Sequence, residues 1–477
     1  MKMGIGIGWA NIGASYITTL IKNFNQRVLS LGGFIYSEVC MENILKGLNS
    51  KGLLKSAYLI NTPTAYGFNQ PGVGTTALFS VVPNTTAGDM ITTRTSGGLR
   101  TASSGFFENA ISQEPLLDYS YFTTCPTILM EPTRTNLTKW SETFNIAYWD
   151  KGLTTVIDNA AFSPMGTTNG SILTEAVGTG SHHIHELTGA FSPVNLSGYA
   201  MSCYVKLPAT NFQRYVQLVF WSAGFGANAY INFDLDRLEV GTKGSAITGF
   251  GITSIGNGWI KLTAVAVSTS TGSSGFQLSF VPSASATRTQ SYTVTAGSEK
   301  SIYLWGAQVE KGTSGRAFST SYIKTTSSVV TRTTPTMTNT NLLGIAGAND
   351  GVFFMDIVIN SRQGSQLQLA FADTLFADAI SVTFQSTSIL FNCDLNGNSY
   401  GTSISNTNAG RFKIAIKYNN NNVDFWINGS MVATLDVIDA IHPAGQFVDA
   451  VGLSHQLITL GVFPLLTNLE ITSLTTI

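Results

Sequence analysis

The sequence predicts a mainly β protein, built of tandem β-sandwich and jelly-roll domains after a short N-terminal segment with one amphipathic helix. Only 11% of the 477 residues are charged, against roughly 25% in an ordinary soluble domain. Helix surfaces usually carry Lys and Glu, whereas β-branched residues suit pleated surfaces and Gly and Asn suit turns. Short runs of alternating apolar and polar residues, separated by turn residues, recur along most of the chain.

Residues 1–56 differ from the rest of the chain. Residues 3–21 carry no charge, but glycines and polar residues dilute them, so neither a signal peptide nor a membrane span is expected. Further on, apolar residues recur at helical spacing ahead of Gly52, which predicts one amphipathic helix: Ile35, Val39, Ile44, Leu45 and Leu48. Its apolar face needs a partner, so we expect this segment to anchor the chain on another protein.

The next two regions, residues 57–136 and 137–335, are predicted to form β structure. Residues 57–136 contain short β-type pieces broken by turn residues, which indicates a small, irregular β region. Residues 137–335 contain longer runs at roughly even spacing, which is typical of a two-sheet sandwich or jelly roll. These runs are YAMSCYVKL, RYVQLVFW, AYINFDLD, GWIKLTAVAVS, FQLSFVP and SIYLWGAQVEK.

Residues 336–477 predict a further β-sandwich. RFKIAIKY, VDFWI and MVATLDV each alternate, and Asn428-Gly429 between the last two is a strong hairpin signal, so the three runs should form an antiparallel meander. Thr467 and Glu470 have the spacing of a capping box, so a short helix should follow near the end of this region.

Several function classes are not expected from the sequence. The net charge of the chain is −1, so the sequence does not indicate the basic surface that binding to nucleic acids requires. No serine-hydrolase elbow, phosphate-binding loop or complete dinucleotide fingerprint occurs, so we expect no enzyme activity. The four cysteines are widely spaced without a C-x-x-C pair, which predicts four free thiols: Cys40, Cys125, Cys203 and Cys393.

Three stretches carry a resemblance to a known protein family. TPTAYGFNQPGVGTTALFSVVP, GLRTASSGFFE and PLLDYSYFTTCPTILMEPTRTNL follow one another in the order seen in tail-fibre and head-fibre proteins of bacteriophages, especially those of Bacteroidetes hosts. YAMSCYVK, NGWIKLT and LWGAQVEKG resemble the jelly-roll module that usually comes next in these proteins, which implies a domain like a carbohydrate-binding module over residues 137–335. FKIAIKYN and VDFWINGSMV resemble laminin-G or concanavalin-like lectin domains.

The resemblance implies a virion protein whose N-terminal segment binds capsid or tail proteins, assembled as a homotrimeric fibre or spike in the host cytoplasm. Its expected function is adhesion to host-surface glycans, in which several weak contacts reinforce one another. A purely structural decoration or connector protein is the alternative, and a capsule-degrading spike enzyme is a further one. Neither nucleic acid nor membrane is an expected partner.

The stretch LMEPTRTNL has two interpretations. Glu131, Arg134 and Asn136 resemble half of a glycosidase site, but glycoside hydrolysis needs a second carboxylate about 5–10 Å away, which the motif does not supply. An arginine–carboxylate pair can instead fix a turn, and Pro132 keeps Glu131 extended. We therefore interpret these residues as a joint between domains.

Two stretches raise the question of metal binding. In HHIHE, residues 182–186, His183 and His185 share one face of a strand and could bind one metal, but two ligands make no closed site. DLNGNS, residues 394–399, begins like a calcium loop but lacks the acidic twelfth residue. We expect a polar strand and an Asn-Gly hairpin turn here, with no cofactor, although calcium is left open.

Carbohydrate binding is the more specific hypothesis. Sugar rings stack on exposed aromatic side chains while amides and hydroxyls bind the ring substituents. Alternation turns Trp426 away from the core, beside Asp424 and Asn428, and Trp221 and Tyr230 flank the flexible stretch SAGFGANA. The opposing interpretation is that a neighbouring domain or subunit covers each of these rings.

Overall fold

The computed structural model describes residues 47, 50, 51, 53, 59–61, 91–112, 115–122, 125–187, 190–339, 350–364, 366–373, 378–419, 421–437 and 446–476. Almost all of the predicted N-terminal helix lies outside these residues. Among those described, no helix has the length and apolar character needed to cross a membrane.

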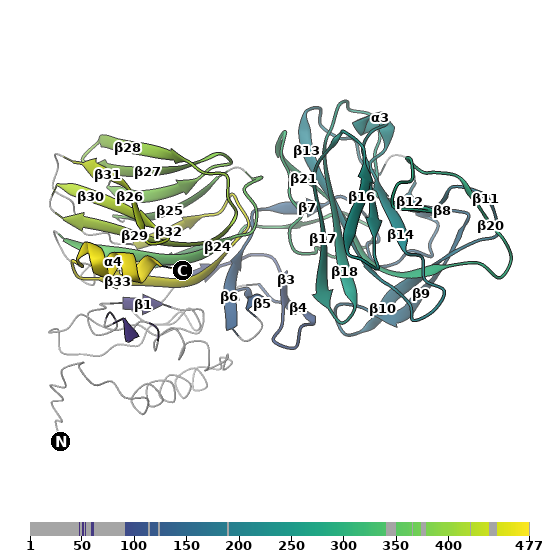
Figure 1. The fold of residues 1–477 in the computed structure, drawn as a ribbon, viewed down its shortest axis with the longest axis horizontal. Helices are drawn as coiled ribbons and strands as arrows, with labels where there is room; N and C mark the ends of the chain where they lie inside the picture. Colours follow the sequence, from purple (N-terminus) through teal and green to yellow (C-terminus); the bar gives the residue numbers. More distant parts are fainter. Residues whose placement is uncertain are drawn as a thin grey trace, which may run out of the picture. The chain divides into compact units, whose positions relative to one another are not determined.

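The chain folds into two compact units. Unit 1 comprises residues 1–95, 112–132 and 334–477, and unit 2 comprises residues 96–111 and 133–333. Both are built of antiparallel sheets, which confirms the predicted fold class (Figure 1). The four-part division drawn from the sequence stays a prediction; residues 57–136 contribute strands to both units.

Two sheets form the sandwich of unit 1. The first has the described strand order β31-β30-β29-β24-β33-β6-β5, with β1 also paired to β33, and the second has the order β2-β23-β32-β25-β26-β27-β28. The strands are β1 (Leu59–Asn61), β2 (Ile91–Thr93), β5 (Leu117–Phe122), β6 (Cys125–Met130), β23 (Thr336–Asn339), β24 (Asp350–Ile359), β25 (Leu367–Ala372), β26 (Ala379–Phe384), β27 (Ser388–Leu395), β28 (Asn398–Ser405), β29 (Gly410–Asn419), β30 (Asn422–Ile427), β31 (Ser430–Asp436), β32 (Gln446–Ala450) and β33 (His455–Phe463).

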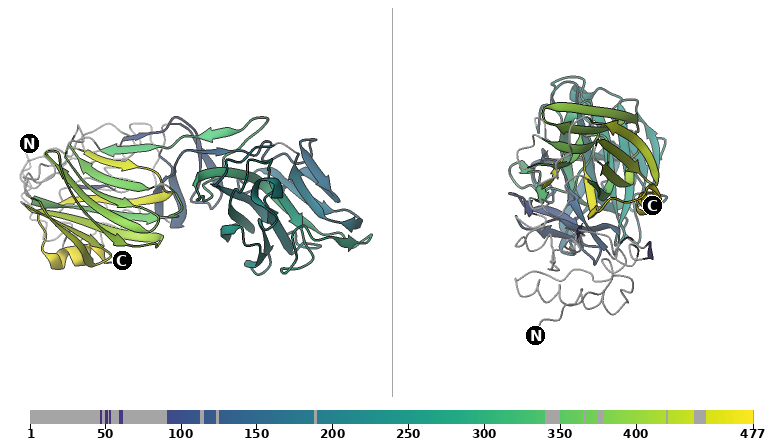
Figure 2. Two further views of the ribbon diagram at one scale, coloured as in Figure 1. Left: turned by 90° about the horizontal axis from the view of Figure 1, so that it is seen from above. Right: turned by 90° about the vertical axis from the view of Figure 1, so that its left-hand side faces the viewer.

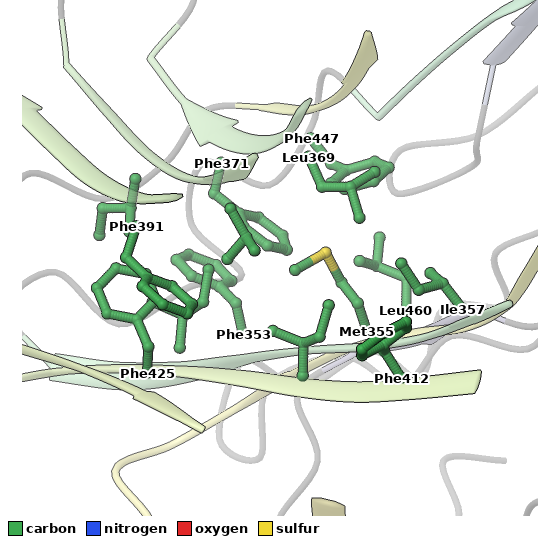
Figure 3. Close-up of a cluster of buried hydrophobic side chains, with 14 of the residues drawn as sticks. Phe353, Met355, Ile357, Leu369, Phe371, Phe391, Phe412, Phe425, Phe447 and Leu460 are labelled. Atoms are coloured by element: carbon green, nitrogen blue, oxygen red, sulfur yellow. The ribbon is translucent and has the colours of Figure 1, made fainter. Parts of the chain in front are cut away.

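The core of unit 1 lies between these two sheets. Apolar side chains of β24 face those of β25, and the rings of Phe353 and Phe371 stack with centroids 3.9 Å apart (Figure 3). Phe412 and Phe425, predicted to point inward, are buried in the same cluster. This places the apolar half of each alternating run in the interior, as the period of a strand requires.

The predicted meander and capping box are both confirmed. β29, β30 and β31 pair in succession, and Asn428 and Gly429 adopt the positive φ values, 48° and 86°, that a tight hairpin turn requires. Helix α4 (Asn468–Thr475) begins after Thr467, which forms a reciprocal capping box with Glu470. Figure 2 shows the strands of unit 1 in two layers, with α4 in yellow.

Unit 2 is a second sandwich, with described strand orders β17-β18-β13-β21-β10-β9 and β16-β15-β14-β19-β12-β8. In addition, β7 pairs with β21 and β22, β11 with β20, and β3 with β4. The elements are β3 (Gly98–Thr101), β4 (Phe107–Ala110), β7 (Arg134–Asn136), β8 (Trp149–Gly152), β9 (Thr154–Phe162), β10 (Thr168–Glu175), β11 (Gly178–Gly180), β12 (His182–Glu186), β13 (Ser197–Lys206), β14 (Tyr215–Val219), α3 (Ser222–Phe225), β15 (Tyr230–Asp234), β16 (Glu239–Lys243), β17 (Ile247–Gly256), β18 (Trp259–Val267), β19 (Gln277–Phe280), β20 (Tyr292–Val294), β21 (Ser301–Ser314) and β22 (Val330–Arg332).

The prediction of four free thiols is wrong at Cys125, and Cys40 lies outside the described residues. Cys203 and Cys393 are free and buried, and burial raises the pKa of the Cys393 thiol to about 12. Cys125, in contrast, is disulfide-bonded. The spacing of cysteines along a chain does not show which of them the fold brings together.

Candidate functional site

The outer face of the six-stranded sheet of unit 2 is polar. Along its strands Ile184, Val216 and Leu278 point into the core, so their neighbours point outward. The strand register then places polar side chains in rows across the sheet. One row joins Asp150, His185 and Gln277, and the next joins Gly152, His183, Ser279, Gln217 and Asn232.

Two buried amides of this face hold a loop above the sheet. Gln217 Nε2 donates to Asn232 Oδ1 at 2.6 Å and to Thr287 O at 3.1 Å, and Thr289 N donates to Gln217 Oε1 at 2.7 Å. Asn232 Nδ2 donates to Ala284 O and Ala286 O, at 3.1 and 2.7 Å. Since every bond ends on loop backbone or on the other amide, the sheet fixes residues 284–289 in place.

Arg288 binds this loop to the backbone on either side of helix α3. Its guanidinium donates to Phe220 O at 2.6 Å, Ala229 O at 3.2 Å and Ala227 O at 3.3 Å. These acceptors are neutral, and burial lowers the pKa of Arg288. Arg288 nevertheless supplies a positive charge to the wall of the site, because arginine stays protonated at neutral pH.

A groove of about 470 Å³ lies between the loop and helix α3. It is lined by Ser181, His183, His185, Trp221, Ser222, Ala223, Gln277, Arg288 and Thr289. Trp221 is half-buried, and its ring meets the His185 ring edge-on with centroids 5.5 Å apart. In the described part of the chain, Trp221 Nε1 makes no hydrogen bond, and such unmet buried donors are rare.

A histidine pair and a carboxylate form one end of this groove. His183 and His185 stack with ring centroids 5.0 Å apart, as their shared face predicted. Asp150 Oδ2 lies 3.7 Å from His183 Nε2 and 3.5 Å from His185 Nδ1. Burial is the main cause that lowers the pKa of each histidine, although Asp150 acts in the opposite direction, so both imidazoles are neutral at neutral pH.

Asp150 was missed by reasoning from the sequence. It lies on β8, which pairs with β12 so that Asp150 stands opposite His185. Its acidic side chain follows the aromatic stretch NIAYW, but nothing in that stretch indicates which strand it will pair with.

A second hollow on unit 2, of about 540 Å³, surrounds Glu175. Its carboxylate already accepts hydrogen bonds from Gln213 Nε2 at 2.8 Å, from Lys300 N at 3.0 Å and from the Tyr292 hydroxyl. Because the protein satisfies this carboxylate, we take the groove at Trp221 as the candidate site.

The expected exposure of Trp426 is corrected by the structure. Its side chain does lie on the face turned away from the core, but it is only 6% exposed. Lys413 and Lys417, on the same face, donate to Thr476 O and Asn468 Oδ1 at the two ends of α4, so this helix lies over the outer face. Helix α4 packs on β29, β30 and β31 and covers the ring.

The companions of Trp426 are also engaged within the protein. Asp424 Oδ1 accepts a hydrogen bond from Thr434 Oγ1 at 2.8 Å, and Asn428 Oδ1 accepts one from Lys413 N at 2.8 Å. Tyr230 is half-buried at the start of β15 and is not part of the groove lining. Of the aromatic candidates, Trp221 is the one that lines the groove.

The residues predicted to form a joint lie on either side of a unit boundary. Pro132 ends a segment of unit 1 and Thr133 begins one of unit 2, so Glu131 belongs to the first and Arg134 to the second. Arg134 lies over the Phe318 ring at 4.9 Å. Their role as a joint stays a prediction.

The turn at DLNGNS is a hairpin. Asn396 and Gly397, both with positive φ, connect β27 to β28, as the Asn-Gly pair predicted. Asp394 accepts a hydrogen bond from Ser399 Oγ, and Asn396 N donates to Asp378 Oδ1 at 2.7 Å. Calcium binding here stays untested.

No protein-family model matches the chain, and no curated protein matches it significantly. Among solved structures, it is similar to the binding domain of botulinum neurotoxin DC in complex with rat synaptotagmin II, at 14% identity and a TM-score of 0.26 over 29% of this chain and 39% of that one. It is also similar to the CBM40 of Ruminococcus gnavus IT-sialidase bound to alpha2,3 sialyllactose, at 15% identity and a TM-score of 0.24 over 29% of this chain and 88% of that one.

A third similar structure is the galectin LEC-6 of Caenorhabditis elegans, with 12% identity and a TM-score of 0.21 over 24% of this chain and 83% of that one. The chain thus spans about two fifths of the neurotoxin domain that it matches.

Proposed function

We propose that the chain is a glycan-binding adhesion protein of a bacteriophage fibre or spike, and that the groove at Trp221 is its sugar site. The observation that carries the glycan part is the half-buried indole of Trp221 in a groove whose other walls supply hydroxyl, amide, imidazole and guanidinium groups. An indole stacks on the C–H face of a sugar ring, while these polar groups hydrogen-bond its hydroxyls. The fibre part is supported by the order of motifs in the sequence.

Of the two tryptophans expected to bind sugar, Trp426 of unit 1 is covered and Trp221 of unit 2 lines the groove. The groove also favours acidic sugars, because Arg288 adds a positive charge and its protein partners are backbone carbonyls. Several copies of the groove on one particle would raise the overall avidity, since each further contact becomes intramolecular.

The test is binding of the full-length chain to an array of neutral and acidic glycans. Trp221→Ala should weaken glycan binding because the stacking surface is lost; stacking of a nucleic-acid base on one aromatic ring contributes on the order of 1–3 kcal/mol, and a loss of this size is about 5- to 150-fold. Phe250→Ala is the matched control, since Phe250 is an aromatic residue of unit 2 that is 51% exposed and outside the groove lining.

The result expected of the control is unchanged glycan binding. A parent chain that binds no glycan would overturn the proposal and favour a purely structural decoration or connector protein. Release of reducing sugars from a bound glycan would instead favour the capsule-degrading enzyme. Equal loss of binding in Trp221→Ala and Phe250→Ala would show that the groove is not the site.

A further inference from the structure

We propose that Asp150, His183 and His185 form a binding site for a divalent transition metal, with Zn²⁺ as the best fit, at the end of the groove. These three side chains each offer one ligand atom, and the atoms all lie within 4.8 Å of one another. The inference is independent of glycan binding, because it rests on the ligand atoms and their surroundings alone.

The separations between the ligand atoms fit one shared ion. Zn²⁺ lies about 2.0–2.2 Å from imidazole nitrogen and carboxylate oxygen, so tetrahedral ligands are about 3.4 Å apart. Asp150 Oδ2 is 3.5 Å from His185 Nδ1 and 3.7 Å from His183 Nε2. These two separations are too long for strong hydrogen bonds and are close to the spacing around a metal, and the two imidazole nitrogens lie within 4.8 Å of each other.

The hydrogen bonding of the ligands also fits. In the described part of the chain, the buried His185 Nδ1 makes no hydrogen bond, and its nearest charged neighbour is Asp150 Oδ2 at 3.5 Å. A metal between these two atoms would supply a partner for the imidazole nitrogen.

The surroundings orient His183 for this role. Ser181 Oγ lies 3.2 Å from His183 Nδ1, at hydrogen-bonding distance, which leaves Nε2 on the side of Asp150. Outer partners of this kind fix the tautomer and the ring direction of metal-binding histidines. The His183 ring lies directly on Gly152, where a Cβ atom would come within 2.3 Å of His183 Cε1. Glycine at this position therefore leaves the space that the imidazole occupies.

Three protein ligands leave a coordination position for another group. The histidines line the groove, and the Asp150 side chain is 48% exposed, so this position is reached from the solvent. Sites with three protein ligands and one exchangeable position are typical of zinc that binds or polarises an oxygen ligand. The mixed nitrogen and oxygen ligands select against Ca²⁺ and Mg²⁺, which prefer oxygen alone.

The test is titration of the untagged full-length chain with Zn²⁺ in a calorimeter, and with Co²⁺ while the visible absorption is recorded. We expect one Zn²⁺ or Co²⁺ ion to bind per chain, and the Co²⁺ absorption bands should be those of a site with nitrogen and oxygen ligands. Asp150→Asn should abolish that binding. Asp236→Asn is the matched control, because Asp236 is another exposed aspartate of unit 2 that pairs with Arg214 at 3.4 Å.

Gly152→Ala is the sharper variant, since it leaves all three ligands in place. Its Cβ atom should push the His183 ring aside and lower the affinity for Zn²⁺ by about 10- to 100-fold, the range found for outer partners of metal ligands. The fold should survive, because the atoms it meets belong to the end of one side chain.

The outcomes separate this inference from the proposed function. Zn²⁺ binding that persists in Asp150→Asn, or Ca²⁺ binding at the same affinity as Zn²⁺, would overturn the metal site. Glycan binding by the chain in the presence of a chelator would leave the adhesion proposal intact even if the metal titration failed. Loss of Zn²⁺ binding in Asp236→Asn as well would assign the ion to some other cluster.

Discussion

Asn136 shows how one amide side chain holds three segments of unit 2 together. Its Nδ2 donates to Ala307 O at 3.1 Å and to Ile323 O at 2.9 Å. Its Oδ1 accepts from Thr138 N and Val309 N, both at 3.1 Å. The side chain is fully buried, so no water replaces these bonds if it is removed.

Replacing Asn136 by alanine should therefore destabilise unit 2. Each backbone group left buried and unpaired costs about 1–3 kcal/mol, so we expect a total loss of at least about 3 kcal/mol in the free energy of unfolding. Urea denaturation of the full-length chain measures it. Asn145→Ala, at an exposed position, should change stability by less than about 0.5 kcal/mol.

Asn136→Asp distinguishes the two halves of the amide. Aspartate keeps an acceptor for the two N–H groups but places an oxygen against two carbonyls, so it should destabilise as much as alanine does. Full stability of Asn136→Asp would show that the donated bonds to Ala307 and Ile323 contribute nothing.

Trp221 and Trp426 show what single residues reveal before a structure is known. Alternation along a strand shows that Trp426 points away from Phe425, and this is correct. It cannot show what covers that face, and here α4 does. The groove at Trp221 is formed in part by a loop that is far away in the sequence. The sequence therefore showed only that Trp221 lies next to the stretch SAGFGANA, and it did not predict the groove.

At the scale of elements, the sequence predicted turns and helix ends correctly, but it did not predict which distant strands pair. The Asn-Gly turns, the meander and the capping box each depend on neighbouring residues, and all are confirmed. The pairing of β8 with β12, which brings Asp150 to the two histidines, depends on the whole sandwich. Two of the three candidate metal ligands, His183 and His185, were therefore predictable from HHIHE, and Asp150 was not.

Helix α4 gives the prediction at this scale. Its capping box satisfies helix N–H groups through Thr467, and Thr467→Ala should cost about 1 kcal/mol. Because α4 covers Trp426, fraying of the helix should also loosen β30 and β31. Hydrogen exchange measured by mass spectrometry should become faster in these three elements and stay unchanged in unit 2.

Ser473→Ala is the matched control for this variant. It removes a hydroxyl from the same helix without touching the cap, and alanine has the higher helix propensity. Exchange in α4 that is as fast in Ser473→Ala as in Thr467→Ala would show that the capping box does not hold the helix in place.

At the scale of the whole molecule, unit 2 interrupts unit 1 in the sequence twice. Unit 1 resumes after residues 96–111 and again after residues 133–333. The two ends of the longer insertion are strands β7 and β22, which pair with Arg134 opposite Arg332. An insertion whose ends lie side by side can form its own core without separating the strands of the host, and each unit has its own buried cluster.

Separate cores predict separate unfolding. Calorimetry of the full-length chain should show two transitions rather than one, since chains with several domains depart from two-state behaviour. Phe353→Ala in the core of unit 1 should cost about 3–5 kcal/mol, and Leu218→Ala in the core of unit 2 about 2–5 kcal/mol. Each variant should lower the midpoint of a different transition by several degrees.

Zn²⁺ at the proposed site would provide an independent assignment of these transitions. A ligand that binds only the folded state raises the midpoint of the unit that holds it. Zn²⁺ should therefore raise the transition that Leu218→Ala lowers, and should leave the one lowered by Phe353→Ala in place. If both variants lowered one shared transition, the two cores would unfold as a single cooperative body, and the separation of the chain into two independently stable units would be wrong.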